Sequence, residues 1–307
     1  MIASHNEQPE ILAATVQGLR ALGSREVVEI VVVDDASDTP IALESLPPWT
    51  KLCRNDTRLG IARSRNVGAK SATGETLIFT DAHVAFTPNV LDVLRESSVA
   101  TGDGIRGCET RLIDGLAGDK VTAAYLGWKL DLAGFPRCWP VTAGAPFDDL
   151  WQDVPYVGGC CLAISRELFD DLGGFADCLV GLGGGGDLEL AIRCHALGLP
   201  VRSTPAAACY HLTENRFSPL EYFDPVSAYD LERYPGSAAN MCRIVLRYLS
   251  AAIAIRKCRE VGFTMEQIEF ICNGDDGAFR RRMETIRPRA TVTGEALLAA
   301  LVAGKSI

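Results

Sequence analysis

The sequence lacks a long apolar run and contains few histidines. No stretch approaches the roughly 18 apolar residues that a membrane-spanning helix needs, and no secretory signal peptide opens the chain. We therefore expect no stable membrane insertion. Only 4 histidines, 4 methionines and 4 tryptophans occur among the 307 residues, so a site that needs histidine can form in few ways.

Eleven cysteines are present, but no pair has the Cys-x-x-Cys spacing of redox or zinc motifs. The number is odd, and Cys160 and Cys161 are adjacent in a strand-like run, where neighbouring side chains point to opposite faces. This pattern favours reduced, buried thiols in a cytoplasmic protein over a disulfide framework.

Positive charge is also scarce. The chain contains 30 Lys and Arg but 39 Asp and Glu, which gives a formal net charge of −9. Proteins that bind DNA or RNA neutralise many phosphates with basic side chains, so we expect no nucleic-acid partner. A single nucleotide remains compatible, since a metal ion and a few arginines neutralise a diphosphate locally. Apolar residues make up 48% of the chain, which is enough for a sizeable core.

The first half of the chain alternates strand and helix patterns, which predicts an α/β fold with a mostly parallel sheet flanked by helices. Only four residues precede His5, so either the first strand is short or the true start lies upstream of Met1. The segment 101–155 is rich in Gly, Pro and Trp and suits loops and edge strands. The predicted strands are 1–4, 29–33, 51–53, 76–80, 157–164 and 201–203 (extended towards 211), and the predicted helices are 9–22, 60–71, 90–99, 166–172 and 187–197.

After about Glu214 the pattern changes to loop and then to helices. We expect one catalytic domain over 1–214, followed over 215–307 by a loop and a helical C-terminal extension that is not an independent domain. The helices predicted in this extension are 238–258, 265–272, 278–286 and 296–302.

Asp81 and His83 follow the apolar strand 76–80, two residues apart. On an extended segment such side chains project from the same side. The carboxyl ends of strands in an open α/β sheet face the ligand crevice. His211 ends another extended apolar run and supplies a third ligand, and oxygen and nitrogen donors together suit Mn²⁺ or Mg²⁺. The alternative is an Asp helix cap with surface histidines, while His195, in the middle of a helix, is expected to pack in the core.

Asp35 closes the buried strand 29–33, where its carboxylate can accept from a uracil N–H or from ribose hydroxyls. The alternative is that Asp34 and Asp35 form a turn with Ser37. Further along, Arg58 and Arg65 flank Gly60, at the start of a predicted helix. A glycine there lets backbone N–H groups approach phosphate, and guanidinium groups pair with its oxygens.

Four glycines, Gly183 to Gly186, precede Asp187 and Glu189 at the start of a predicted helix. Asp187 on such a loop is placed to act as a general base on an acceptor hydroxyl. Glu189 would orient the acceptor. The alternatives are a helix cap for Asp187 and a favourable interaction of Glu189 with the helix dipole.

With these residues in view, the chain resembles the polypeptide N-acetylgalactosaminyltransferases and, more broadly, family-two glycosyltransferases of the GT-A (Rossmann-like) fold. The resemblance spans roughly residues 1–250, and its most specific part is Asp81-x-His83 with the downstream His211. The resembling segments are His5-Asn6-Glu7, 29–37, 54–69, 81–83, 158–166, 185–193 and His211.

The resemblance implies that Asp81, His83 and His211 hold Mn²⁺ or Mg²⁺ and that a UDP-sugar is the donor. Gly158 and Gly159 would lie against the donor sugar, and a mobile loop over 212–224 would close over it. The residues implied or expected to bind the nucleotide are Ala3, His5, Asn6, Glu7, Asp35, Arg58, Gly60, Arg65 and Asp81.

The chain departs from the pattern at Gly186, where the family has Glu, and at Asp187, where it has Asn. An Asp at that place is the base in inverting relatives, so we expect inversion with Asp187 as base, with a retaining GalNAc-type transferase as the alternative. We expect the donor sugar to be a hexose or an N-acetylhexosamine, and the acceptor to be a hydroxyl or thiol of a peptide, glycan or small molecule. The lectin domain and membrane anchor of the animal enzymes have no counterpart, which suggests a soluble bacterial relative.

Three other protein classes fit the sequence less well. A sugar-nucleotide nucleotidyltransferase would carry a glycine-rich basic loop where this chain has His5-Asn6-Glu7. A non-catalytic nucleotide-binding module would explain the altered 183–186 run but not an intact metal-ligand set. A dinucleotide-dependent oxidoreductase would need Gly-x-Gly-x-x-Gly after the first strand, and that motif does not occur there.

Overall fold

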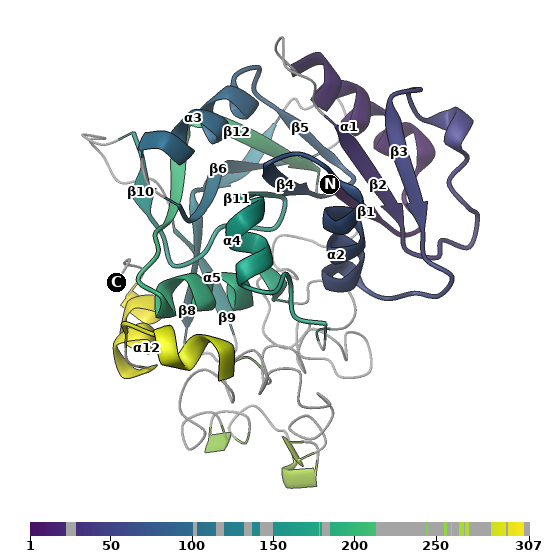
Figure 1. Cartoon of the computed structure of the whole chain (residues 1–307). Helices are drawn as coiled ribbons and strands as arrows, with labels where there is room; N and C mark the ends of the chain where they lie inside the picture. The colour runs from purple at the N-terminus through teal and green to yellow at the C-terminus, as the bar shows by residue number, and fades with distance from the viewer. Residues whose placement is uncertain are drawn as a thin grey trace.

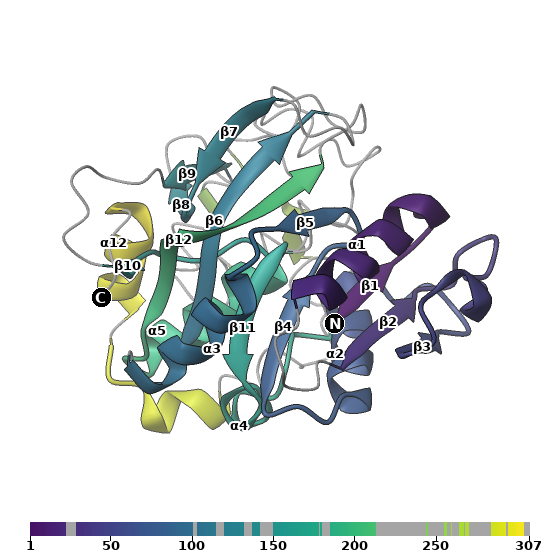
Figure 2. The same ribbon diagram turned by 90° about the horizontal axis from the view of Figure 1, so that it is seen from above.

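A mixed sheet of ten strands forms the centre of the molecule, with helices on both of its faces (Figures 1 and 2). The computed structural model describes residues 1–22, 29–100, 103–114, 120–131, 137–141, 150–177, 179, 185–212, 284–292 and 294–303, with single positions between 244 and 269. The helices are α1 (Pro9–Leu22), α2 (Ile61–Ser71), α3 (Val90–Ala100), α4 (Arg166–Asp171), α5 (Gly186–Ala196) and α12 (Gly294–Ala303), with 3₁₀ turns at Leu43–Ser45 and Arg287–Arg289.

The sheet order is β10-β12-β6-β11-β4-β1-β2-β3, with β5 paired to β12 and β7 paired to β6. Because only β11 reverses between β4 and β6, the strands β1, β2, β3, β4, β6 and β12 all run in one direction. Their carboxyl ends therefore lie along one edge. The strands are β1 (Ile2–Ser4), β2 (Ile30–Asp34), β3 (Thr50–Arg54), β4 (Thr76–Thr80), β5 (Val84–Phe86), β6 (Ile105–Ile113), β7 (Val121–Tyr125), β10 (Gln152–Asp153), β11 (Cys161–Ser165) and β12 (Val201–Leu212), with β8 (Gly127–Asp131) and β9 (Arg137–Val141) as a separate ribbon.

Hydrophobic periodicity explains where the core lies. Helix α1 buries Ile11, Leu12, Val16 and Leu19, and all five residues of β2 are buried. Helices α1 and α3 cover one face of the sheet, whereas α2, α4 and α5 cover the other (Figure 2). The predicted helices and strands of the first hundred residues are confirmed, and the bounds of α1 agree to the residue.

The segment 101–155 differs from the prediction of loops and edge strands. Nine of its residues form β6, which lies inside the sheet between β11 and β12. The strand carries Arg106, Gly107 and Glu109, which hide its apolar pattern. Gly107 is needed because a Cβ there would lie 2.7 Å from a Val157 side-chain carbon. The predicted strand 157–164 likewise begins only at Cys161. A turn precedes it, closed by a hydrogen bond from the Cys161 N–H to the Gly158 carbonyl.

The C-terminal residues that the structure describes pack on the same core. Leu297 and Leu301 of α12 belong to the hydrophobic cluster that also contains Leu188 and Leu190 of α5, and the Thr291 N–H donates to the Ala196 carbonyl at 2.8 Å. The predicted helix 296–302 is confirmed with two more residues at its start. The predicted loop after residue 212 and most of 238–286 lie outside the described residues, so the division at 214 stays a prediction.

No helix in the described part of the chain is long and apolar enough to span a membrane.

Candidate functional site

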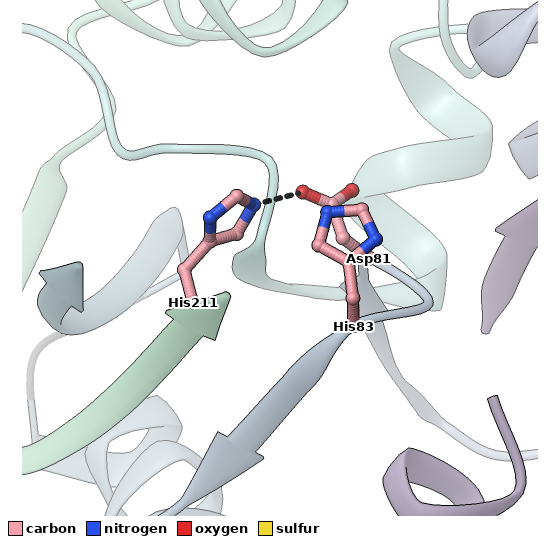
Figure 3. A group of neighbouring side chains, drawn as sticks. All are labelled: Asp81, His83 and His211. Atoms are coloured by element: carbon pink, nitrogen blue, oxygen red, sulfur yellow. Dashed lines mark hydrogen bonds and ion pairs between the residues drawn. The ribbon is translucent and has the colours of Figure 1, made fainter. Parts of the chain in front are cut away.

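Three side chains meet where strands β4 and β12 end and β5 begins (Figure 3). Asp81 directly follows β4, His83 directly precedes β5, and His211 is the penultimate residue of β12. Antiparallel pairing of β5 with β12 sets His211 opposite Val84 and so beside His83. One ligand atom from each of the three residues lies within 4.8 Å of the others. The predicted meeting of Asp81, His83 and His211 is thereby confirmed.

The electrostatics of this cluster favour a charged carboxylate. Burial opposes the charge of Asp81, but a hydrogen bond from His211 and the nearby Arg65 guanidinium hold its pKa well below the usual range. His211 Nε2 lies 3.2 Å from Asp81 Oδ2. Burial lowers the pKa of His211, but this hydrogen bond overcomes it and leaves the pKa raised.

The donor set fits a divalent ion. One carboxylate and two imidazoles, all partly exposed, are the ligands of a hard-to-borderline cation such as Mn²⁺. The two imidazole rings stand 4.9 Å apart at 75° to each other, so they approach the common space from different directions. His211 points its Nε2 towards Asp81, which makes Nε2 the ring nitrogen that faces the shared space (Figure 3).

Glu7 supports His83 from behind. Its Oε2 lies 2.8 Å from His83 Nδ1, and its side chain is 4% exposed. Because a carboxylate accepts, the contact puts the proton on Nδ1 and leaves Nε2 free to bind a metal. We expected Glu7 to contact the nucleotide, but in the structure its carboxylate pairs with His83 instead. No sequence spacing signals this contact, since 76 residues separate the two.

A hollow beside the cluster collects most of the predicted nucleotide-binding residues. It opens between the ends of β1 and β2 and the start of α2. Its lining residues are Ala3, Ser4, His5, Asp35, Arg58, Gly60 and Ile61. Five of these were predicted from the sequence, whereas Ser4 and Ile61 were missed. The hydroxyl of Ser4 is buried and has no hydrogen-bond partner.

Asp35 fixes the loop that enters α2. Its Oδ1 accepts from Asn55 Nδ2 and the Leu59 N–H, and its Oδ2 accepts from the Gly60 N–H, all at 2.8 Å. Burial opposes its charge, but these hydrogen bonds keep the pKa of Asp35 below the usual value. Gly60 has φ 86° and ψ 166°, a conformation that is essentially limited to glycine. Neighbouring Asp34 forms the turn with Ser37 that we considered as the alternative reading.

The segment after β1 is tied to the segment after β2. His5 Nδ1 lies 2.8 Å from the Asp35 carbonyl oxygen, and the Asn6 N–H donates to Ser37 Oγ at 2.9 Å. The Asn6 side chain exchanges two hydrogen bonds with Asp38. The backbone of Asn6 has a φ of 53°. His5 thus lines the hollow, whereas Asn6 ties the two segments together.

Arg65 is buried beside Asp81 and does not line the hollow. Only 5% of its side chain is exposed. Its Nη2 donates to Asp81 Oδ1 at 2.9 Å and to the Gly159 carbonyl at 2.7 Å. We expected Arg65 to pair with phosphate oxygens. That expectation is corrected, because the guanidinium is already engaged by a carboxylate and a carbonyl inside the protein.

Asp187 and Glu189 lie in different environments on α5. Asp187 sits in the first turn, where its Oδ2 accepts from the Gly159 N–H at 3.1 Å. Burial raises the pKa of Asp187 although Arg65 and backbone N–H groups oppose the rise. The helix cap is Gly185, not Asp187. Glu189 is fully buried in an ion pair with Arg193, so the expectation that it orients an acceptor is corrected.

The remaining glycines and histidine have close packing partners. A Cβ on Gly158 would lie 3.3 Å from Trp128 Nε1, and one on Gly159 would lie 2.6 Å from Arg65 Nη1. His195 is buried, with Nε2 2.7 Å from the Pro155 carbonyl oxygen, which confirms its predicted packing role. Residues 183 and 184 of the glycine run lie outside the described part.

Residues 1–173, more than half of the chain, match the family described as Glycosyl transferase family 2. The chain belongs to glycosyltransferase family 2. Human polypeptide N-acetylgalactosaminyltransferase 15 is 28% identical over 237 residues, which cover 72% of this chain and 37% of the relative. Polypeptide N-acetylgalactosaminyltransferase 8 of Drosophila melanogaster is 27% identical over 228 residues, which cover 69% of this chain and 37% of the relative. The chain thus spans little more than a third of the length of these relatives.

Two solved structures share the fold of this family-two chain. GalNAc-T7 with UDP, GalNAc and Mn²⁺ superposes with a TM-score of 0.69 at 20% identity and covers 94% of this chain and 56% of that one. The mannosyltransferase PcManGT from Pyrobaculum calidifontis, in complex with GDP-Man and Mn²⁺, superposes with a TM-score of 0.52 at 17% identity, covering 98% and 84%. Together with the sheet topology they confirm the predicted GT-A, Rossmann-like α/β fold.

Proposed function

We propose that this chain is a metal-dependent glycosyltransferase that moves a sugar from a UDP-sugar to an acceptor. The observation that carries the proposal is the Asp81–His83–His211 cluster beside the hollow at the ends of β1 and β2. A metal-bound diphosphate and its nucleoside need two adjoining sites of this kind. The relatives support it, because they are N-acetylgalactosaminyltransferases by name and the similar GalNAc-T7 structure contains UDP and Mn²⁺.

Asp81, His83 and His211 would hold Mn²⁺ or Mg²⁺. Bound there, the ion would neutralise charge that develops on the departing diphosphate. His5 and Arg58 line the hollow and would contact the uridine nucleotide. Asp35 holds the start of α2 through the Gly60 N–H and would also accept a hydrogen bond from the nucleoside. Gly158 and Gly159 would face the donor sugar, a hexose or an N-acetylhexosamine.

Asp187 is the group that would activate the acceptor. Its carboxylate accepts the proton of an acceptor hydroxyl, or thiol, while that atom bonds to the anomeric carbon and the bond to UDP breaks. Burial raises the pKa of Asp187, and a raised pKa makes the carboxylate a stronger base. Attack from the side opposite to UDP would invert the anomeric configuration. The alternative is a GalNAc-type transferase that retains the anomeric configuration. Peptides, glycans and small molecules are all candidate acceptors.

Incubation with a panel of UDP-sugars and Mn²⁺ tests this function. We expect UDP release from one donor, faster with the right acceptor, and a product of inverted anomeric configuration by NMR. The Asp81→Ala variant should keep its fold by circular dichroism and lose UDP release. No release from any donor, or full release by the Asp81→Ala variant, would contradict the proposal.

A further inference from the structure

A buried arginine links the metal cluster to the candidate base. The guanidinium of Arg65, on α2, donates through Nη2 both to Asp81 and to the Gly159 carbonyl. The N–H of the same Gly159 donates to Asp187 Oδ2 at 3.1 Å. A continuous chain of hydrogen bonds therefore runs from Asp81 through Arg65 and one residue of backbone to Asp187.

Gly159 is placed so that no other residue fits without moving Arg65. A Cβ would lie 2.6 Å from Arg65 Nη1, closer than real Cβ contacts, and 3.1 Å from Nη2, tighter than most of them. On its other side the guanidinium lies 5.7 Å from the centre of the Phe175 ring. The ring and the glycine turn thus confine the planar guanidinium in a slot, and a methyl group on the turn would push it away from Asp81.

We propose that Arg65 and Gly159 form a positioning bridge that holds Asp81 and Asp187 in a fixed relation. This inference rests on the proposed function and deepens it. Arg65 acts on the metal through Asp81 and does not bind phosphate itself. Gly159 acts through Arg65 on one side and directly on Asp187 on the other. The donor-side and acceptor-side carboxylates are thereby oriented by one buried cation.

Physical chemistry favours an arginine for this task. A guanidinium spreads its donors in a plane and so serves two acceptors in a fixed direction, whereas an ammonium on a flexible stem orients its partners less well. Residues that orient a metal ligand typically change metal affinity about 10- to 100-fold when mutated. The bridge therefore predicts an effect on metal affinity from a glycine that touches no metal ligand.

Mn²⁺ affinity without donor, measured by electron paramagnetic resonance, tests the bridge. We expect Gly159→Ala and Arg65→Met each to weaken Mn²⁺ binding about 10-fold or more. In the Arg65→Met background, Gly159→Ala should add nothing, because the group it displaces is already gone. Arg65→Lys should recover part of the affinity. Arg63→Met is the matched control, since Arg63 lies exposed on the same helix and bonds the Asp177 carbonyl instead.

The outcomes separate this inference from the proposed function. Wild-type protein that binds no Mn²⁺ would overturn both. Wild-type affinity in a folded Gly159→Ala variant, or additive effects in the double variant, would overturn only the bridge. If Gly159→Ala does not fold by circular dichroism, equal Mn²⁺ affinity of Arg65→Met and wild type overturns it. At saturating Mn²⁺ and donor, kcat of Gly159→Ala should still be reduced, because Asp187 loses the orientation that the turn gives it.

Discussion

Asp187 and Glu189 are two residues apart at the start of α5, yet their carboxylates have different neighbours. Asp187 faces the Gly159 turn beside the metal cluster, whereas Glu189 pairs with Arg193 in the interior. A buried carboxylate opposite one arginine contributes to the fold, and losing one partner of such a pair typically costs about 3–5 kcal/mol. At the residue scale, Asp187 is therefore the carboxylate on α5 that we propose as the base.

Replacing Asp187 by Asn should lower transfer by about 10²- to 10⁴-fold, the usual contribution of a general base. Mn²⁺ and UDP affinities should be unchanged, because the amide keeps the shape of the side chain. Turnover and UDP affinity, measured by assay and calorimetry, check this. Glu189→Gln is the matched control and should lower the melting temperature more than the turnover of the folded protein. A parallel loss of UDP affinity in Asp187→Asn would make Asp187 a structural residue.

The pH dependence of transfer should reflect the raised pKa of the partly buried Asp187. Burial raises the pKa of Asp187, and a base works only when deprotonated. Activity should therefore fall, as the pH is lowered, at a higher pH than the roughly 3.9 of an ordinary Asp. A pH–rate profile of kcat measures this limb, and Asp187→Asn should lack it. A profile that stays flat down to the ordinary Asp range would contradict the assignment.

Single-residue predictions succeeded where a strand end positions a side chain. Asp81, His83 and His211 follow from strand ends alone and meet as expected. The partners behind them could not be predicted, because Glu7 reaches His83 across 76 residues of sequence and Arg65 reaches Gly159 across 94. Such contacts depend on how elements pack, which a local pattern does not encode.

At the scale of elements, the start of α2 forms one wall of the hollow at the ends of β1 and β2. Asp35 accepts the Leu59 and Gly60 N–H groups, and Gly60 takes a backbone conformation with φ 86°. The geometry of this wall is thus set by one carboxylate and one glycine. The sequence predicted the helix and its glycine, but it did not reveal that Asp35 holds them.

Gly60→Ala should destabilise the protein by roughly 1–3 kcal/mol, because a Cβ strains this backbone conformation. It should also weaken UDP binding, since the strain would be relieved by moving the wall of the hollow. Thermal melting and UDP titration measure both effects. Gly74→Ala is the control, because a Cβ there meets only the Thr76 carbonyl at an ordinary 3.6 Å. Unchanged melting and UDP affinity in Gly60→Ala would contradict the role given to this turn.

Element prediction depended on clear periodicity. Helix α1 shows its apolar face at Ile11, Leu12 and Val16 and was predicted to the residue. Strand β6 was missed, because Arg106 and Gly107 break its apolar pattern in a strand that lies inside the sheet. Tertiary packing, with Val157 against Gly107, determines that strand.

At the scale of the whole molecule, the C-terminal helix and the sheet share one hydrophobic cluster. Leu301 is 1% exposed and belongs to the cluster that contains Phe79 of β4 and Leu190 of α5. A shared cluster predicts that the described C-terminal helix and the sheet unfold together.

Leu301→Ala should therefore lower the stability of the whole chain by about 2–5 kcal/mol, in a single transition. Calorimetry together with circular dichroism measures the number of transitions. Val302→Ala, on the same helix but only partly buried, is the control and should cost less. A separate low-temperature transition, with the main one unchanged, would mean that the extension folds by itself.

The most direct test of the account is a calorimetric titration of UDP into the protein with and without Mn²⁺. We predict binding that requires the metal and is lost in both His83→Ala and His211→Ala, with the fold of each variant retained by circular dichroism. UDP binding of equal strength without the metal, or in either variant, would contradict the assignment of Asp81, His83 and His211 as the metal centre of a glycosyltransferase.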